Sequence, residues 1–281
     1  MDLSKKDGGL PPDSVVQTID EIMKDSERLV RVWHDDARFS MHQVALAPCS
    51  PFSVTGDLLR ESARLARALG VRLHTHVAET RDEEQFTLEK YGLRPVAYMQ
   101  SLGWTGSDVW YAHGIHFNDD ELRVLAETGP GVARSPEMLE LGVPVGLAVD
   151  GSASNDGSSL LEELRMAYLL HRLTSSRRAP TGYDVLKMAT RGSARLLGRD
   201  DIGQLAEGKC ADLFMIDARR LELVGCGCGV GDLLGTVGVR GPVDYTIVHG
   251  RVTVEDGRLT TVDEEQLARE AEAKCRAYLA M

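Results

Sequence analysis

The runs QVALAPC (43–49), VRLHTHV (71–77) and DVWYAH (108–113) decide the fold class. Each is short and mostly apolar, and the stretches between them have helical spacing, as in the amphipathic DLLRESARLARAL (57–69). Strands that alternate with helices and carry apolar residues almost throughout are typical of a parallel sheet buried on both faces. We therefore predict an α/β fold. An open doubly wound sheet and a (β/α)₈ barrel both agree with this pattern equally well. No GxGxxG or GxxxxGK[ST] follows a strand, so a nucleotide-binding open sheet lacks its best marker.

The pattern changes after residue 200, where short runs of strand character are separated by turns. Asp256-Gly257 is a tight-turn signal between two of these runs, and the chain ends in a helical stretch. We predict three parts: an α/β domain over 1–200, a small β-module over 201–262 and a C-terminal helix over 263–281. The further elements predicted are strands at 131–134, 143–150, 211–217, 243–248 and 251–254, and helices at 19–33, 119–127 (capped by Asn118 and Glu121), 159–173 and 182–197.

The composition excludes several classes of protein. Of 281 residues, 43% are hydrophobic and 27% charged, as in a globular protein. Asp and Glu number 43 against 32 Lys and Arg, and the net charge of −11 argues against nucleic-acid and anionic-membrane binding. No run approaches the roughly 18–20 apolar residues of a membrane span. The cysteines are odd in number and form no CxxC, so we expect reduced thiols in a cytoplasmic protein.

The polar residues that could carry chemistry lie at the C-terminal ends of the apolar strands. His74 and His76 share one face of a strand, and Glu79 follows three residues after His76. His113 ends the next strand, and Asp150 ends the run VPVGLAVD. Active sites form at this edge of parallel α/β sheets. Two imidazoles and a carboxylate converging there predict a metal site, whose N and O ligands favour Zn²⁺ or Fe²⁺.

Plainer interpretations stay open for the same residues. A single histidine at a strand end is more often structural than catalytic, and Asp150 could instead cap the turn that follows it. The sequence pattern alone does not decide between these interpretations.

Several stretches together resemble the amidohydrolase superfamily: HTHVAE (74–79), AHGIHFNDDEL (112–122), GVPVGLAVDGSASND (142–156) and EGKCADLFMID (207–217). The likeness is greatest to its cytosine/guanine-type aminohydrolases. Within that branch DGGLPPDSVVQ (7–17), LAPCSPFSVT (46–55) and VDGSASNDGSSL (149–160) resemble 8-oxoguanine deaminases and hydroxyatrazine hydrolases. The resemblance implies a (β/α)₈ TIM barrel of the metal-dependent hydrolase type, incomplete here, beside a small β-sandwich.

The resemblance also implies a role for each candidate residue. His76 would be the metal ligand on the fifth barrel strand and Glu79 the proton shuttle of an HxxE motif. His113 would orient hydroxide or substrate, and Asp150 would bind the metal and accept a proton from the attacking water. The implied cofactor is one Zn²⁺ (or Fe²⁺) per subunit of a homo-oligomer, namely a dimer. The implied reaction is hydrolytic deamination of an oxopurine such as 8-oxoguanine.

Two departures from the family pattern limit this expectation. The family's first strand carries an HxH pair that binds the metal, but the one HxH here, His74-Thr75-His76, matches the fifth strand. We expect the chain to begin after the third barrel strand. The connection from Arg134 to Val143 is also shorter than the dozen or so residues usual between parallel strands. We therefore expect the 281-residue chain by itself to hold little zinc and to deaminate 8-oxoguanine poorly. An s-triazine hydrolase and a non-catalytic remnant are the alternatives.

Overall fold

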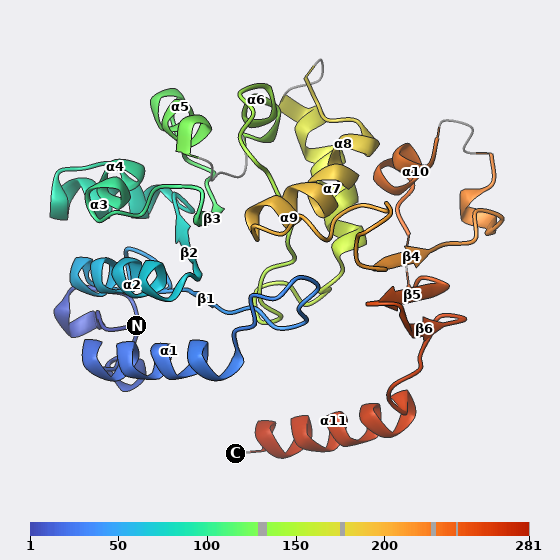
Figure 1. The fold of residues 1–281 in the computed structure, drawn as a ribbon, viewed down its shortest axis with the longest axis horizontal. Coiled ribbons are helices and arrows are strands. Elements are labelled where there is room, and N and C mark those ends of the chain that lie inside the picture. The colour runs from blue at the N-terminus through green and yellow to red at the C-terminus, as the bar shows by residue number, and fades with distance from the viewer. Residues whose placement is uncertain (129–133, 175–177, 226–228, 240, 281) are drawn as a thin grey trace.

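The computed structural model describes residues 1–128, 134–174, 178–225, 229–239 and 241–280 (Figure 1). Its elements in chain order are η1 (Lys5–Asp7), η2 (Asp13–Val15), α1 (Ile19–Trp33), β1 (Ala45–Leu46), α2 (Gly56–Leu69), β2 (Arg72–Val77), α3 (Arg81–Tyr91), α4 (Pro95–Ser101), β3 (Val109–His113), α5 (Asp119–Thr128), α6 (Ser135–Glu140), α7 (Leu160–Thr174), α8 (Gly182–Lys187), the π-helical turn η3 (Met188–Gly192), α9 (Ser193–Leu196), β4 (Leu213–Met215), η4 (Leu221–Leu223), α10 (Val230–Thr236), β5 (Tyr245–Val248), β6 (Arg251–Glu255), β7 (Arg258–Leu259) and α11 (Glu264–Leu279).

The first sheet is parallel, with the order β1-β2-β3. Helix α2 connects the first two strands, and α3 and α4 connect the second and third. Figure 1 shows α2 between this sheet and α1. The parallel sheet and its crossover helices confirm the predicted α/β class over this part of the chain.

Threonine caps explain where several helices begin. The Thr hydroxyl accepts a hydrogen bond from the third helical N–H at the start of α1, α2, α3 and α8, at Thr18, Thr55, Thr80 and Thr181. This satisfies an N–H that has no partner within the helix. Gly70 and Gly92 follow the ends of α2 and α3 in the left-handed conformation, which glycine adopts at little cost.

The core lies between the first sheet and its helices. Leu73 and Val77 of β2 are fully buried in one cluster with Leu59 of α2 and Trp104. The Trp104 indole N–H donates to the Leu59 carbonyl at 2.8 Å, and the Tyr111 hydroxyl donates to the Trp104 carbonyl. The buried polar groups of these aromatic side chains are therefore satisfied.

The second sheet is antiparallel, with the order β4-β5-β6-β7. Asp256 and Gly257 join its last two strands with φ angles of 49° and 74°. A two-residue turn with positive φ at both positions matches the twist of a hairpin. The predicted β-module after residue 200 is confirmed as an antiparallel sheet, while its exact domain limits stay a prediction.

Residues 143–150 differ from the prediction, because within the described chain they form no strand. The Leu147 carbonyl accepts a hydrogen bond from the Ser193 hydroxyl at 3.3 Å. A Cβ on Gly192 would lie 1.9 Å from the Val145 carbonyl oxygen, so this stretch runs directly against the helical turn. Its backbone therefore contacts a helix where the prediction expected a neighbouring strand. The strand predicted at 131–134 falls mainly on 129–133, outside the described residues.

The helices after residue 158 also depart from the prediction in one place. The stretch predicted as one helix at 182–197 is α8, a π-helical turn and α9 in succession. Helix α11 is exposed along its whole length and lies apart from the other elements in Figure 1. Among the described residues, no helix has both the length and the apolar character to cross a membrane.

Candidate active site at the ends of β2 and β3

His76 lies on the exposed side of β2, near its C-terminal end. Leu73, Thr75 and Val77 are buried, while His74 and His76 on the opposite face are partly accessible. This is the alternation that the period of a strand requires, and it confirms that the two histidines share a face.

The carbonyl of Cys49 fixes the orientation of the His76 ring. It accepts the His76 backbone N–H at 3.0 Å and lies 2.5 Å from ring Nδ1, which donates to it. The proton on Nδ1 is thereby assigned, and Nε2 is left as the nitrogen with a free lone pair. Metal-binding histidines are commonly held in this way by a backbone carbonyl. The arrangement suits His76 to bind a metal through Nε2.

Hydrogen bonding to Cys49 favours the protonated form of the His76 ring. The Cys49 side chain raises the pKa of His76 to about 9, and the nearby Glu79 acts in the same direction. The Cys49 Sγ lies 4.0 Å from Nδ1, and His76 in turn lowers the pKa of that thiol. A metal ion at Nε2 would compete with a proton for the same lone pair.

His113 ends β3 and lies against His76. The two ring centroids are 5.1 Å apart and the rings are inclined by 26°. Simple alternation would place His113 on the buried face, because it is the register partner of Val77. His113 instead has φ 69°, a left-handed value uncommon for a residue with a side chain. The altered backbone at the end of β3 accompanies the contact of this ring with His76.

Glu79 reaches the same place from the turn after β2. Its Oε2 lies 3.7 Å from His113 Nε2, and its side chain is 45% exposed. The predicted residues His76, Glu79 and His113 thus meet at the C-terminal edge of the sheet. A partly exposed carboxylate beside an imidazole can pass protons between solvent and a bound molecule.

Glu83 is a further part of this site that the sequence interpretation missed. Only 1% of it is exposed, and its two carboxylate oxygens accept the backbone N–H groups of Ala78 and Glu79 at 2.8 and 3.0 Å. Burial raises the pKa of Glu83 to about 7, while the two N–H donors lower it. The signal was present in the sequence: TRDE (80–83) has the Thr-x-x-Glu pattern of a helix start.

His74 serves a structural purpose. Its ring stacks on Trp110 at a centroid distance of 5.0 Å, and its Nδ1 lies 3.3 Å from the Trp110 carbonyl oxygen. Burial lowers the pKa of His74, which keeps it neutral. The pKa of His74 is thus lowered and that of His76 is raised. Of the two, His76 is the one whose ring stacks on His113, beside Glu79.

Asp150 is exposed, and its carboxylate accepts the N–H of Gly151 at 2.6 Å. Like His113 it has a left-handed backbone, with φ 65°. This contact agrees with the structural interpretation, in which Asp150 caps the following turn. The role of Asp150 as a metal ligand stays a prediction. Among the described residues, no group of three His, Cys, Asp or Glu side chains is placed to hold a metal together.

Comparison with known proteins identifies the family. The family model for the amidohydrolase family matches residues 3–253. The chain belongs to the amidohydrolase family. It is 45% identical to an 8-oxoguanine deaminase of Pseudomonas aeruginosa, matching 100% of this chain and 65% of that protein. It is 40% identical to a hydroxydechloroatrazine ethylaminohydrolase of Pseudomonas sp. strain ADP, over 99% of this chain and 61% of the relative.

A solved structure extends the comparison to the fold. An atrazine chlorohydrolase from Arthrobacter aurescens TC1, complexed with zinc, matches with a TM-score of 0.90 and 32% identity, over 97% of this chain and 64% of that chain. The amidohydrolase described here therefore has the α/β architecture of the family's TIM-barrel enzymes, as predicted. It spans less than two thirds of the relatives it matches.

Members of this family bind a divalent metal, and His76 fits one ligand position of such a site. Its Nε2 is oriented by the Cys49 carbonyl and lies on the same side as His113 and Glu79. A catalytic zinc ion usually has three protein ligands, and no such set of three comes together among the described residues of this amidohydrolase.

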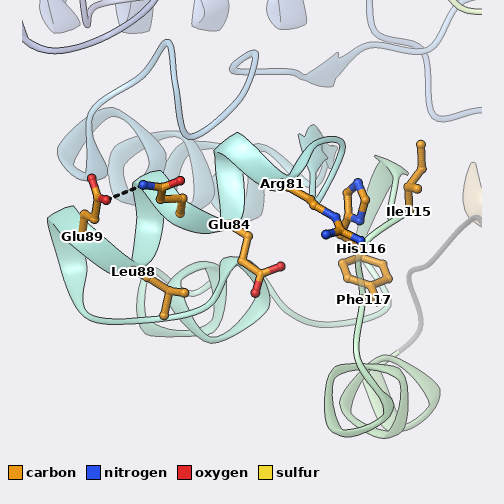
Figure 2. A pocket seen from close by; sticks show the side chains of 8 residues that line it. Arg81, Glu84, Leu88, Glu89, Ile115, His116 and Phe117 are labelled. Carbon is orange, nitrogen blue, oxygen red and sulfur yellow. Dashed lines mark hydrogen bonds between the residues drawn. The ribbon is translucent and has the colours of Figure 1, made fainter.

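A pocket of about 530 Å³ lies next to this site, between α3 and the segment after β3 (Figure 2). Arg81 and Glu84 line it from α3, and Ile115, His116 and Phe117 line it from the segment. Figure 2 shows the Arg81 side chain extending toward His116. The lining residue Arg81 follows Glu79 by two positions, and Ile115 follows His113 by two. The pocket therefore adjoins the candidate active site, although neither Glu79 nor His113 lines it.

Proposed function

We propose that this amidohydrolase is a metal-dependent deaminase of an oxopurine such as 8-oxoguanine. The observation that carries the proposal is the meeting of His76, Glu79 and His113 at one strand edge, with Nδ1 of His76 bound to a carbonyl. The substrate class is supported by 45% identity to an 8-oxoguanine deaminase along the whole chain.

Each residue has a defined part in this proposal. His76 would hold zinc through Nε2, with Asp150 as a second ligand and proton acceptor. When bound, zinc would make hydroxide available near neutral pH. Glu79 would take one proton from the attacking water and deliver it to a ring nitrogen. It would then pass the second proton, which Asp150 accepts from the same water, to the departing amine, so that ammonia leaves. His113, which lies between His76 and Glu79, would orient the incoming hydroxide or the substrate.

A second candidate is hydrolysis of an s-triazine. It is favoured by 40% identity to a hydroxydechloroatrazine ethylaminohydrolase and by the likeness to an atrazine chlorohydrolase structure. A hydroxytriazine and an oxopurine both present a ring carbon bearing a nitrogen substituent beside a ring nitrogen. The same residues could therefore serve both reactions, and only the substrate contacts would differ.

The oligomeric state and the cellular compartment of the enzyme are part of the same proposal. We expect a cytoplasmic homodimer with a small heterocyclic substrate. The described cysteines Cys49, Cys210 and Cys275 are free thiols, as a reducing compartment requires.

The test uses two proteins: the 281-residue chain, and an extended chain. The extended chain is this sequence joined to the part of the P. aeruginosa relative outside the match. We expect the extended chain to release ammonia from 8-oxoguanine with kcat/KM at least about tenfold above that for an ethylamino-substituted hydroxytriazine. The 281-residue chain should be far less active, because its described residues bring together fewer than three metal ligands. Zinc-free extended chain is the control.

Faster turnover of the triazine would favour the second candidate. An extended chain that acts on no oxopurine or triazine would contradict both, and would leave the non-catalytic interpretation.

A further inference from the structure

The carboxylate of Glu83 is buried and is occupied by backbone donors. Its Oε1 accepts the Ala78 N–H at 2.8 Å and its Oε2 accepts the Glu79 N–H at 3.0 Å. Glu83 is 1% exposed, so both hydrogen bonds are shielded from water. A buried acceptor shared by two successive N–H groups fixes the orientation of the peptide between them.

This arrangement differs from an ordinary helix cap. Glu83 is the third residue of α3, after the cap residue Thr80. A glutamate at this position commonly returns to the N–H of the cap residue itself. Glu121 at the start of α5 does so, since it accepts the N–H of Asn118 at 2.9 Å. Glu83 instead reaches one and two residues further back, to Glu79 and Ala78.

The segment that Glu83 holds is strained and carries the proposed proton shuttle. Ala78 has φ 53°, a left-handed value that is unfavourable for a residue other than glycine. The Glu79 side chain is 45% exposed, and its Oε2 lies 3.7 Å from Nε2 of His113. Few contacts of its own side chain therefore keep Glu79 in place, whereas its backbone is tightly held.

We propose that Glu83 is a positioning residue for Glu79. By holding the Ala78–Glu79 backbone in its left-handed turn, Glu83 directs the Glu79 carboxylate toward His113. The catalytic consequence rests on the proposed function, in which Glu79 carries the proton. The structural consequence, an ordered Glu79 backbone, holds whether or not the chain is a deaminase.

Glu83→Gln tests the proposal, because an amide has one acceptor oxygen and its NH₂ group cannot accept from an N–H. In the metal-free 281-residue chain, hydrogen exchange at the Ala78 or Glu79 amide should accelerate about tenfold, the scale of one lost hydrogen bond. In the extended chain kcat should fall about tenfold or more, with KM and zinc content within about twofold of the unsubstituted protein.

Glu121→Gln is the matched control, a buried glutamate at the same position of helix α5. It should leave exchange at Ala78 and Glu79 unchanged and alter kcat less than about twofold. Unchanged exchange in Glu83→Gln would overturn the proposal, as would equal losses of kcat in both variants. If the extended chain without substitutions releases no ammonia, the proposed function fails, and the exchange measurement still decides whether Glu83 positions Glu79.

Discussion

Three residues in or next to the candidate site have an unusual backbone conformation. Ala78, His113 and Asp150 all have left-handed φ values, and each follows or ends an apolar run. Such conformations cost of order 1–3 kcal/mol each and persist where the surrounding structure enforces them. Around Ala78 the enforcing groups are visible: Glu83 accepts its N–H, and its carbonyl accepts the His116 N–H at 3.0 Å. The family resemblance assigns chemistry to His113 and Asp150, and Ala78 directly precedes a third such residue, Glu79.

Glu79→Gln in the extended chain should separate proton transfer from metal binding. The substitution removes a proton carrier and not a proposed ligand, so zinc content should stay near that of the unsubstituted protein. Turnover should fall about 10²-fold or more, the usual contribution of general acid–base catalysis. Zinc by atomic absorption and ammonia release from the same sample check this result.

Asp150→Asn supplies the contrast to Glu79→Gln, because Asp150 is proposed both to bind the metal and to accept a proton. It should lower zinc content and turnover together. Equal, mild effects of the two substitutions would show that the roles are assigned wrongly.

At the scale of elements, one buried ion pair joins segments far apart in the sequence. Asp201 binds Arg199 through two hydrogen bonds of 2.6 and 2.7 Å and accepts the Phe39 N–H at 2.7 Å. Arg199 also donates to the Ser40 carbonyl at 3.2 Å. The pair thus anchors the segment before β1 to the chain that leads into the second sheet. The Arg199 guanidinium holds the pKa of Asp201 well below its usual range.

Asp201→Asn should destabilise the fold by on the order of 3 kcal/mol at neutral pH, since it leaves a buried arginine without its partner charge. The lowered pKa stabilises the folded state above the unfolded value of about 3.9. The difference in free energy of unfolding between the two proteins should therefore shrink progressively as pH falls below about 4, toward the lowered pKa of folded Asp201. Urea unfolding at several pH values measures it.

Asp25→Asn is the control for Asp201→Asn, because the Asp25–Arg28 pair is exposed and such pairs contribute little. A constant difference between wild type and Asp201→Asn from neutral pH to below about 4 would show that the charge of Asp201 does not stabilise the fold.

The sequence predicted those elements whose pattern is local. The alternation in VRLHTHV placed His76 on the accessible face of β2, and Asp256-Gly257 marked the hairpin of the second sheet. Asn118 and Glu121 cap α5 as predicted. Each of these signals depends on neighbouring residues, so tertiary contacts do not change it.

Predictions failed where tertiary contacts decide the structure. The apolar run at 143–150 has no periodicity that separates a strand from an extended segment, and its position against Ser193 was not readable from the sequence. Glu83 was passed over because its partners Ala78 and Glu79 lie beyond the usual reach of a helix cap. The His113 ring contacts His76 only because the backbone of His113 leaves the extended region.

At the scale of the molecule, the described chain holds a parallel sheet, a set of helices and a separate antiparallel sheet (Figure 1). The proposed chemistry is confined to the ends of β2 and β3, and the pocket of Figure 2 adjoins it. The proposed domain limits at residues 200 and 262 would separate the catalytic part from the antiparallel sheet and from α11. The function of the molecule therefore depends mainly on whether His76 holds a metal.

The most direct measurement is zinc content and ammonia release from 8-oxoguanine, determined together in the extended chain and in its His76→Asn variant. We expect about one zinc ion per chain and steady ammonia release without the substitution. The His76→Asn variant should lose both, because it removes the nitrogen that the Cys49 carbonyl orients toward the site. Ammonia release that persists in His76→Asn, or in zinc-free protein, would contradict the account.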